Sequence, residues 1–167
     1  MTPEDLPAYS ATGRLPLCPR PVNTRAIVER CVAPVRAGTA RTIESSYADT
    51  TPKICADLDK LSQVVTNLVD NAIRHGEGTV RVSVEPITTP LAGVLIRVDD
   101  EEGEGISEAI RARVFTKFWK HGVRGGTGLG MYIVNGLVRV HGGEVTSGDS
   151  ETGGGGLDVR WPCDDRR

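Results

Sequence analysis

The chain has 167 residues, of which 38% are hydrophobic and 25% charged, as expected for one globular domain with its own core. Its 20 basic and 22 acidic residues give a formal net charge of −2, so it lacks the basic surplus of a nucleic-acid-binding protein. The sequence contains neither an apolar run of membrane-spanning length nor the apolar core of a signal peptide.

Hydrophobic periodicity predicts two helices in the first half of the chain. Residues 1–21 are rich in proline and show no period, so we expect a linker or disordered arm there. The first helix is predicted at Thr24–Ala37, where Pro34 would end or kink it. The second is predicted from Leu58 to His75, with Asp57 as its N-terminal cap.

Alternating apolar residues predict six strands. They are Thr42–Ser46, Lys53–Ala56, Thr79–Glu85, Val94–Asp100, Gly143–Ser147 and Gly156–Trp161. A short helix from Ser107 to Val114 and a longer one from Leu129 to Val140 are expected around a glycine-rich loop. The fold class is therefore α/β: a two-layer α/β sandwich with a mixed sheet and helices on one face. The ordered domain is expected to span 22–162, followed by a frayed tail at 163–167.

Polar side chains recur on one face of the predicted helix 58–75. Gln63, Asn67, Asn71 and Arg74 fall at i, i+4, i+8 and i+11, opposite the aliphatic stripe. Two amide oxygens one turn apart suit Mg²⁺, a hard cation that takes oxygen ligands, and Arg74 could meet a phosphate. On spacing alone, however, a solvated polar face is the simpler interpretation.

Two glycine-rich segments suggest contacts with a ligand. The strand 94–100 runs into DDEEGEGI, and its alternation places Asp100 on the face of Val98. A carboxylate there could accept a hydrogen bond from an exocyclic amine, while the turn after it admits a flat base. The loop 121–128 leads into a helix, whose N-terminal amides could bind phosphate. Taken alone, the acidic segment is more often just a turn, and a flexible hairpin or lid explains the loop 121–128 equally well.

In this order, the segments resemble the ATP-binding domain of sensor histidine kinases, within the GHKL ATPase superfamily. LSQVVTNLVDNAIRHG resembles the asparagine box, and VDDEEGEGI resembles the first glycine box. RVFTKFWK resembles the phenylalanine box, and GGTGLGMYIV the second glycine box. The resemblance covers about Val22 to Pro162 and implies a Bergerat-type fold that binds Mg·ATP between the asparagine-box helix and a mobile lid.

The resemblance also implies a role for each matching residue. Asn67 and Asn71 would serve Mg²⁺ and the phosphates, with Asn71 the more direct metal ligand. Arg74 stands where the family usually has Lys and would face phosphate. The adenine pocket would be shaped by Gly103 and Gly105. The lid and the triphosphate loop would contribute Lys120, Arg124, Gly126, Thr127, Gly128, Leu129 and Gly130, and of these Lys120 and Arg124 would reach the γ-phosphate.

The sequence departs from the family pattern at two places. The first glycine box is usually Asp-x-Gly-x-Gly, but Asp100 lies three residues before Gly103, and Glu101 lies two before it. Strand alternation favours Asp100 as the residue that contacts the adenine amine. The closing strand usually has a Thr near Gly155, where this chain has no hydroxyl, so one adenine contact would be missing.

Each of the three histidines, His75, His121 and His141, is followed by glycine, which excludes a phosphoacceptor in the middle of a helix. We therefore expect a catalytic subunit resembling the stand-alone ATP-binding subunit of a split mycobacterial two-component sensor kinase. It would phosphorylate a His on the dimerisation hairpin of a separate protein, which would then pass the phosphate to a response regulator. Alone, it is expected to be monomeric, without nucleic-acid binding or membrane insertion. Its widely spaced cysteines predict reduced thiols in the cytoplasm.

Two alternatives stay open. Anti-sigma-factor kinases share the superfamily and lack the hairpin, but they phosphorylate Ser or Thr and typically have Glu where Asn67 stands. A carboxylate there can act as general base on a hydroxyl, whereas a neutral imidazole nitrogen needs no base. The other alternative is a regulatory nucleotide-binding module without transfer. The altered first glycine box favours it, while Asn71 and the second glycine box argue against it.

Overall fold

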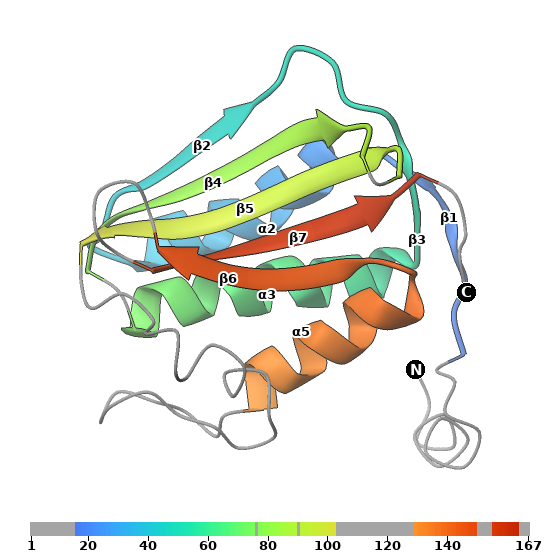
Figure 1. The fold of residues 1–167 in the computed structure, drawn as a ribbon. Coiled ribbons are helices and arrows are strands. Elements are labelled where there is room, and N and C mark those ends of the chain that lie inside the picture. The colour runs from blue at the N-terminus through green and yellow to red at the C-terminus, as the bar shows by residue number, and fades with distance from the viewer. Residues whose placement is uncertain (1–15, 76, 90, 103–128, 150–154, 164–167) are drawn as a thin grey trace.

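A computed structural model describes residues 16–75, 77–89, 91–102, 129–149 and 155–163 of the chain. These residues form a five-stranded sheet of order β2–β4–β5–β7–β6 and a two-stranded sheet of β1 and β3. The helices of the described part lie against one face of the larger sheet (Figure 1). Only the pair β2–β4 is parallel, so the larger sheet is mixed. The predicted two-layer α/β sandwich is therefore confirmed.

Most described elements lie close to their predicted positions. The strands are β1 (Arg20–Val22), β2 (Ile43–Tyr47), β3 (Ile54–Ala56), β4 (Glu77–Ile87), β5 (Gly93–Glu102), β6 (Glu144–Asp149) and β7 (Gly155–Pro162). The helices are α2 (Thr24–Gly38), α3 (Leu58–His75) and α5 (Leu129–Val140). In the part of the chain that the structure describes, every helix falls short of the length and apolarity that a membrane span requires. The helix predicted at 107–114 and the loop 121–128 lie outside the described residues.

The N-terminal part differs from prediction in two details. Pro34 does not end α2, which continues to Gly38. Proline removes the N–H that would bond the carbonyl of Arg30, but both residues are exposed, so water can satisfy that carbonyl. Residues 20 and 21, expected in the arm, belong to β1, which pairs antiparallel with β3.

The core lies between the sheet and the helices. The cross-strand pairs Val82–Val98 and Val84–Ile96 of β4 and β5 are buried on the face that the helices cover. Opposite them lies the aliphatic stripe of α3, whose members are all buried: Leu61, Val64, Val65, Leu68, Val69 and Ala72. Burial of each such side chain stabilises the fold by roughly 1.5–3 kcal/mol.

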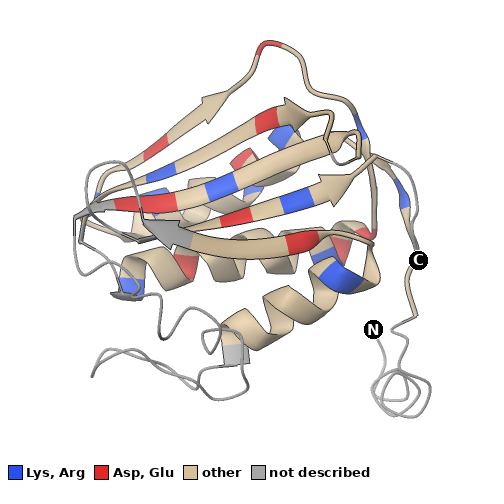
Figure 2. Cartoon of the chain, viewed as in Figure 1, with Lys and Arg blue, Asp and Glu red and all other residues tan. Residues whose placement is uncertain are grey.

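The other face of the sheet carries charged residues of both signs on neighbouring strands (Figure 2). Arg97 of β5 forms a two-pronged ion pair with Asp158 of β7, at 2.8 and 3.2 Å. Arg81 of β4 lies 4.0 Å from Glu44 of β2. Apolar residues on one face and polar residues on the other are typical of a sheet that is covered on one side only.

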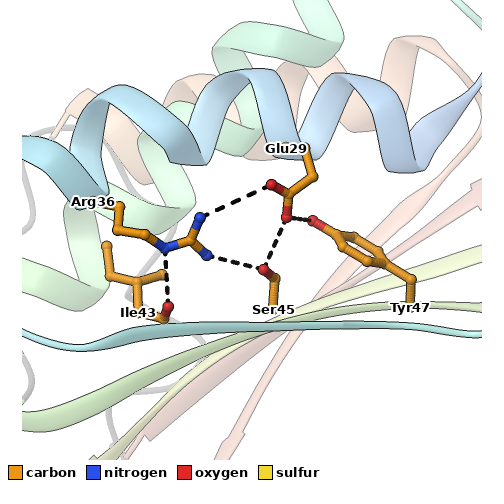
Figure 3. Close-up of polar contacts among 5 residues, drawn as sticks. All are labelled: Glu29, Arg36, Ile43, Ser45 and Tyr47. Atoms are coloured by element: carbon orange, nitrogen blue, oxygen red, sulfur yellow. Dashed lines mark hydrogen bonds and ion pairs between the residues drawn. The ribbon is translucent and has the colours of Figure 1, made fainter.

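A polar network ties α2 to the edge strand β2 (Figure 3). Glu29 accepts hydrogen bonds from Ser45, at 2.9 Å, and from the hydroxyl of Tyr47. Arg36 donates to Ser45 at 2.9 Å and to the carbonyl of Ile43 at 3.2 Å. The hydrogen bond from Tyr47 lowers the pKa of Glu29, while burial and the bond to Glu29 raise the pKa of Tyr47 to about 12. Glu29 therefore stays ionised and holds β2 against α2.

The N-terminus of α3 and the C-terminus of α5 meet at His141, which is 2% exposed. Its Nε2 accepts a hydrogen bond from the backbone N–H of Asp57 at 3.1 Å, and its Nδ1 lies 2.7 Å from the carbonyl oxygen of Leu137. Because an amide N–H can only donate, the imidazole proton is on Nδ1 and is donated to Leu137. The ring packs against Trp161, with centroids 4.5 Å apart. His141 is thus a structural residue.

Candidate functional site

Helix α3 presents the predicted amides beside its buried stripe rather than opposite it, because Asn67 and Asn71 are partly buried. The side chain of Asp57 caps the helix, because its Oδ1 accepts hydrogen bonds from the amides of Asp59 and Lys60 at 3.0 and 3.2 Å. Asn67 and Asn71 are half-buried. With the stripe fixed in the core, the two amides lie at the border between the core and the solvent, one helical turn apart.

Arg74 has an acidic neighbour on the same helix. Its Nε lies 3.0 Å from Oδ2 of Asp70, and the side chains of Arg74 and Asp70 are 50% and 53% exposed. An exposed ion pair at i, i+4 contributes only about 0.3–0.5 kcal/mol, so Arg74 can leave it at little cost. A contact between Arg74 and phosphate stays a prediction.

Asp100 lies near the end of β5, directly opposite Val80 of β4. It is 6% exposed and shares the helix-covered face with Val98, as strand alternation predicts. Carboxylates are seldom buried in a protein, and those that are cluster at functional sites, which makes Asp100 a candidate for a functional group. The side chain of Glu101 lies outside what the structure describes, so the choice between the two carboxylates as adenine contact stays a prediction.

These features share one end of the molecule. The last turns of α3, the start of β4 and the end of β5 lie there, and α5 begins below α3 in the same view (Figure 1). The first turn of α5 carries no acidic residue, and a Cβ added at Gly130 would meet nothing within 4 Å. The amides at a helix N-terminus have no partner within the helix and lie at its positive dipole end, so they favour an anion such as phosphate.

The sheet is irregular beside Asp100. Glu77 pairs with Glu102 and Val80 with Asp100, so β4 has one more residue than β5 between these pairs, which is a β-bulge. Gly78 in this bulge has φ of 78°, a conformation that favours glycine. The bulge therefore lies next to the pair that Val80 forms with Asp100.

Several predicted site residues cannot be compared with the structure because they lie outside the described residues. They are Gly103, Gly105, Lys120, Arg124, Gly126, Thr127 and Gly128. Sequence reasoning in turn missed Arg41, which follows α2 and contacts the end of α3. It belongs to none of the motifs, and only the tertiary fold brings it to this end of the molecule.

The family model that matches residues 56–165, more than half of the chain, is described as histidine kinase-, DNA gyrase B- and HSP90-like ATPase. The chain belongs to this family. The resemblance of the four boxes to the catalytic ATP-binding domain of sensor histidine kinases is thereby confirmed. This GHKL domain combines the expected fold with the expected asparagine-box helix.

Curated relatives of this GHKL domain include two actinobacterial kinases. The signal transduction histidine-protein kinase AfsQ2 of Streptomyces coelicolor is 36% identical over 112 residues, which are 65% of this chain and 20% of AfsQ2. The probable sensor histidine kinase TcrY of Mycobacterium tuberculosis is 38% identical over 117 residues, which are 66% of this chain and 24% of TcrY. The chain therefore spans a quarter or less of the length of these relatives.

Solved structures agree with the fold. Full-length ShkA in complex with AMPPNP superposes with a TM-score of 0.78 at 25% identity, over 95% of this chain and 34% of ShkA. The mycobacterial sensor histidine kinase MprB gives 0.73 at 26% identity, over 87% of this chain and 97% of that chain. The ATP-binding domain of PrrB from Mycobacterium tuberculosis superposes with a TM-score of 0.69 at 27% identity, over 87% of this chain and 98% of that chain.

Proposed function

We propose that this GHKL domain binds Mg·ATP at the end where α3, β5 and α5 meet, and phosphorylates a histidine on a separate partner protein. The observation that carries the proposal is the position of Asp100. Its buried carboxylate lies near the end of β5, on the face of the sheet that α3 covers, and α3 carries the half-buried amides of Asn67 and Asn71. The ShkA structure in complex with AMPPNP supports a nucleotide as ligand.

The described residues fit the parts of Mg·ATP. Asp100, shielded from water, would accept a hydrogen bond from the exocyclic amine of adenine. Asn71, with Asn67 one turn before it, offers the amide oxygens that a hard cation takes. Bound there, Mg²⁺ would neutralise phosphate charge. The amides at the start of α5 would bind phosphate oxygens, and Arg74 could join them after it leaves Asp70.

In the transfer step, a ring nitrogen of the acceptor histidine forms a bond to the γ-phosphorus. The bond from that phosphorus to the β–γ bridging oxygen breaks, ADP takes the electron pair, and the other ring nitrogen releases its proton. This chemistry depends on positioning and on charge neutralisation. Asn67 is an amide and cannot act as a base, which favours an imidazole over a hydroxyl as acceptor. A response regulator would then receive the phosphate, and the supply of ATP favours a cytoplasmic setting.

The acceptor is proposed to lie on a partner because His141 is unsuitable. Its ring is buried and both ring nitrogens are engaged with the backbone. A partner of the split-kinase kind would carry the acceptor on a helical dimerisation hairpin. The chain alone would remain a monomer, and its interface with the hairpin would be transient.

Phosphoryl transfer in trans can be tested with radiolabelled ATP. Alone, the chain is expected to acquire no acid-labile, base-stable phosphate. Mixed with a protein that carries an acceptor-histidine hairpin, it should label that protein and not itself. Labelling of His75, His121 or His141 in the isolated chain would contradict the proposal. Labelling of a partner on Ser would instead indicate a kinase of the anti-sigma-factor type. Nucleotide binding without any phosphoryl transfer would indicate a regulatory module.

The adenine contact gives a second test. Asp100→Asn is expected to weaken the binding of an ATP analogue about 10- to 100-fold. A hydrogen bond to a charged group contributes roughly 1.5–3 kcal/mol, and about 1.4 kcal/mol corresponds to a tenfold change in the dissociation constant. Fluorescence titration of the analogue measures this, with Glu101→Gln as the matched control. The control should bind as wild type does. If Glu101→Gln loses affinity and Asp100→Asn keeps it, Glu101 makes the contact.

A further inference from the structure

Arg41, in the segment that joins α2 to β2, binds two elements at once. Its Nη1 donates to the carbonyl oxygens of Ala72 and Ile73 in the last turn of α3, at 3.2 and 2.8 Å. Its Nε donates to the carbonyl oxygen of Gly78 in β4, at 2.9 Å. The residue is half-buried. One planar guanidinium therefore bridges the end of the helix and the start of the strand that follows it.

Arg41 binds backbone carbonyls at the end of α3 and in the bulge of β4, where regular secondary structure is interrupted. The last carbonyls of a helix have no partner within it, and a positive charge there also favours the helix dipole. Gly78 belongs to the β-bulge that precedes Val80, the residue paired with Asp100. The neighbouring residue Thr42 accepts a hydrogen bond from the amide of Val80 at 2.9 Å, which extends the same attachment past the bulge. Arg41 thus connects the α3 turn that follows Asn71 with the β4 bulge that precedes the Val80–Asp100 pair.

We propose that Arg41 is a positioning residue for the nucleotide site. It fixes the last turn of α3, which carries Arg74 and directly follows Asn71, relative to the end of β5 that carries Asp100. The inference rests on the proposed nucleotide site, because it assigns Arg41 a role in that site's geometry. A lysine would not replace Arg41, since a single ammonium cannot reproduce the fork that reaches both elements.

The test compares Arg41→Lys and Arg41→Ala with Arg97→Ala. Arg97 is a matched control because it alternates with the buried Ile96 and Val98, so its ion pair with Asp158 lies on the face of the sheet away from α3. Two quantities are measured well below each variant's Tm: the affinity for a fluorescent ATP analogue with Mg²⁺, and amide hydrogen exchange along the chain. Tm itself is recorded to compare the overall loss of stability.

Both Arg41 variants are expected to lose affinity about tenfold or more, because a small misplacement of binding groups is costly, while Arg97→Ala keeps wild-type affinity at a similar Tm. In both Arg41 variants, amide hydrogen exchange should rise about tenfold or more in the last turn of α3 and the start of β4, and it should stay unchanged in β7. The proposal is overturned if Arg41→Lys binds as wild type does, or if affinity only follows Tm in all variants. If the wild type binds no nucleotide, the proposed function fails. Even then, hydrogen exchange at the end of α3 that is the same in the Arg41 variants and in wild type would refute positioning by Arg41.

Discussion

Asn71→Ala is expected to abolish measurable binding of Mg·ATP while the fold remains intact. Asn71 is half-buried at the edge of the stripe of α3, so its truncation removes an amide oxygen without opening the core. A methyl group cannot replace an oxygen ligand of a hard cation. Titration of a fluorescent ATP analogue, with Mg²⁺ and with EDTA, measures the loss, and circular dichroism checks the fold.

Thr66→Ala is the matched control for this experiment, since Thr66 is exposed on the same helix. It should bind the analogue as wild type does, and EDTA should weaken that binding to the same extent. Equal affinity of Asn71→Ala and wild type in the presence of Mg²⁺ would remove Asn71 from the metal site. A loss that is the same with and without Mg²⁺ would assign Asn71 to the nucleotide rather than to the metal.

His141→Ala is expected to lower the free energy of unfolding by about 2–4 kcal/mol, because it leaves a cavity and two backbone groups without their partner. The cavity would open beside Trp161, which is fully buried, and the groups are the amide of Asp57 and the carbonyl of Leu137. In a domain of this size the loss corresponds to a fall in Tm of roughly 4–16 °C. Urea and thermal unfolding measure both quantities.

Tyr132→Ala provides the comparison for His141→Ala, because Tyr132 is 48% exposed on the same helix α5. It should change stability by no more than about 0.5 kcal/mol, as surface substitutions usually do. If the two variants lose the same stability, the contacts of His141 contribute little. Acid-labile phosphate on His141 in the folded wild type would also contradict its structural role.

The elements that the sequence predicted best are those with strong periodicity and a clear end signal. Helix α3 has both, with its aliphatic stripe and the cap at Asp57, and its bounds match the prediction. Strands β4 and β5 extend beyond the predicted ranges, because ladder pairing continues past the last apolar residue. Strand β1 was missed because three residues show no period and their partner β3 is far away in sequence.

The same reasoning applies to the site. Burial of Asp100 followed from strand alternation, and the shared flank of Asn67 and Asn71 followed from helical spacing. The pair Arg74–Asp70 has i, i+4 spacing and could have been predicted. The resemblance to the asparagine box assigned Arg74 to phosphate instead. Arg41 could not be found this way, because its partners lie 31 to 37 residues away and only the tertiary fold brings them together.

The parallel pairing of β2 with β4 has a consequence for how the domain opens. Among the described strands, β2 lies at the edge of the sheet and pairs with β4 alone, and all of α3 separates the two in sequence. Closing so long a loop costs chain entropy, so we expect α2 and β2 to detach together more easily than the antiparallel strands. Detachment would carry Arg41 away while α3 and the antiparallel strands β4, β5, β7 and β6 stay together. Local unfolding of the edge would then loosen the end of α3 before the domain as a whole unfolds.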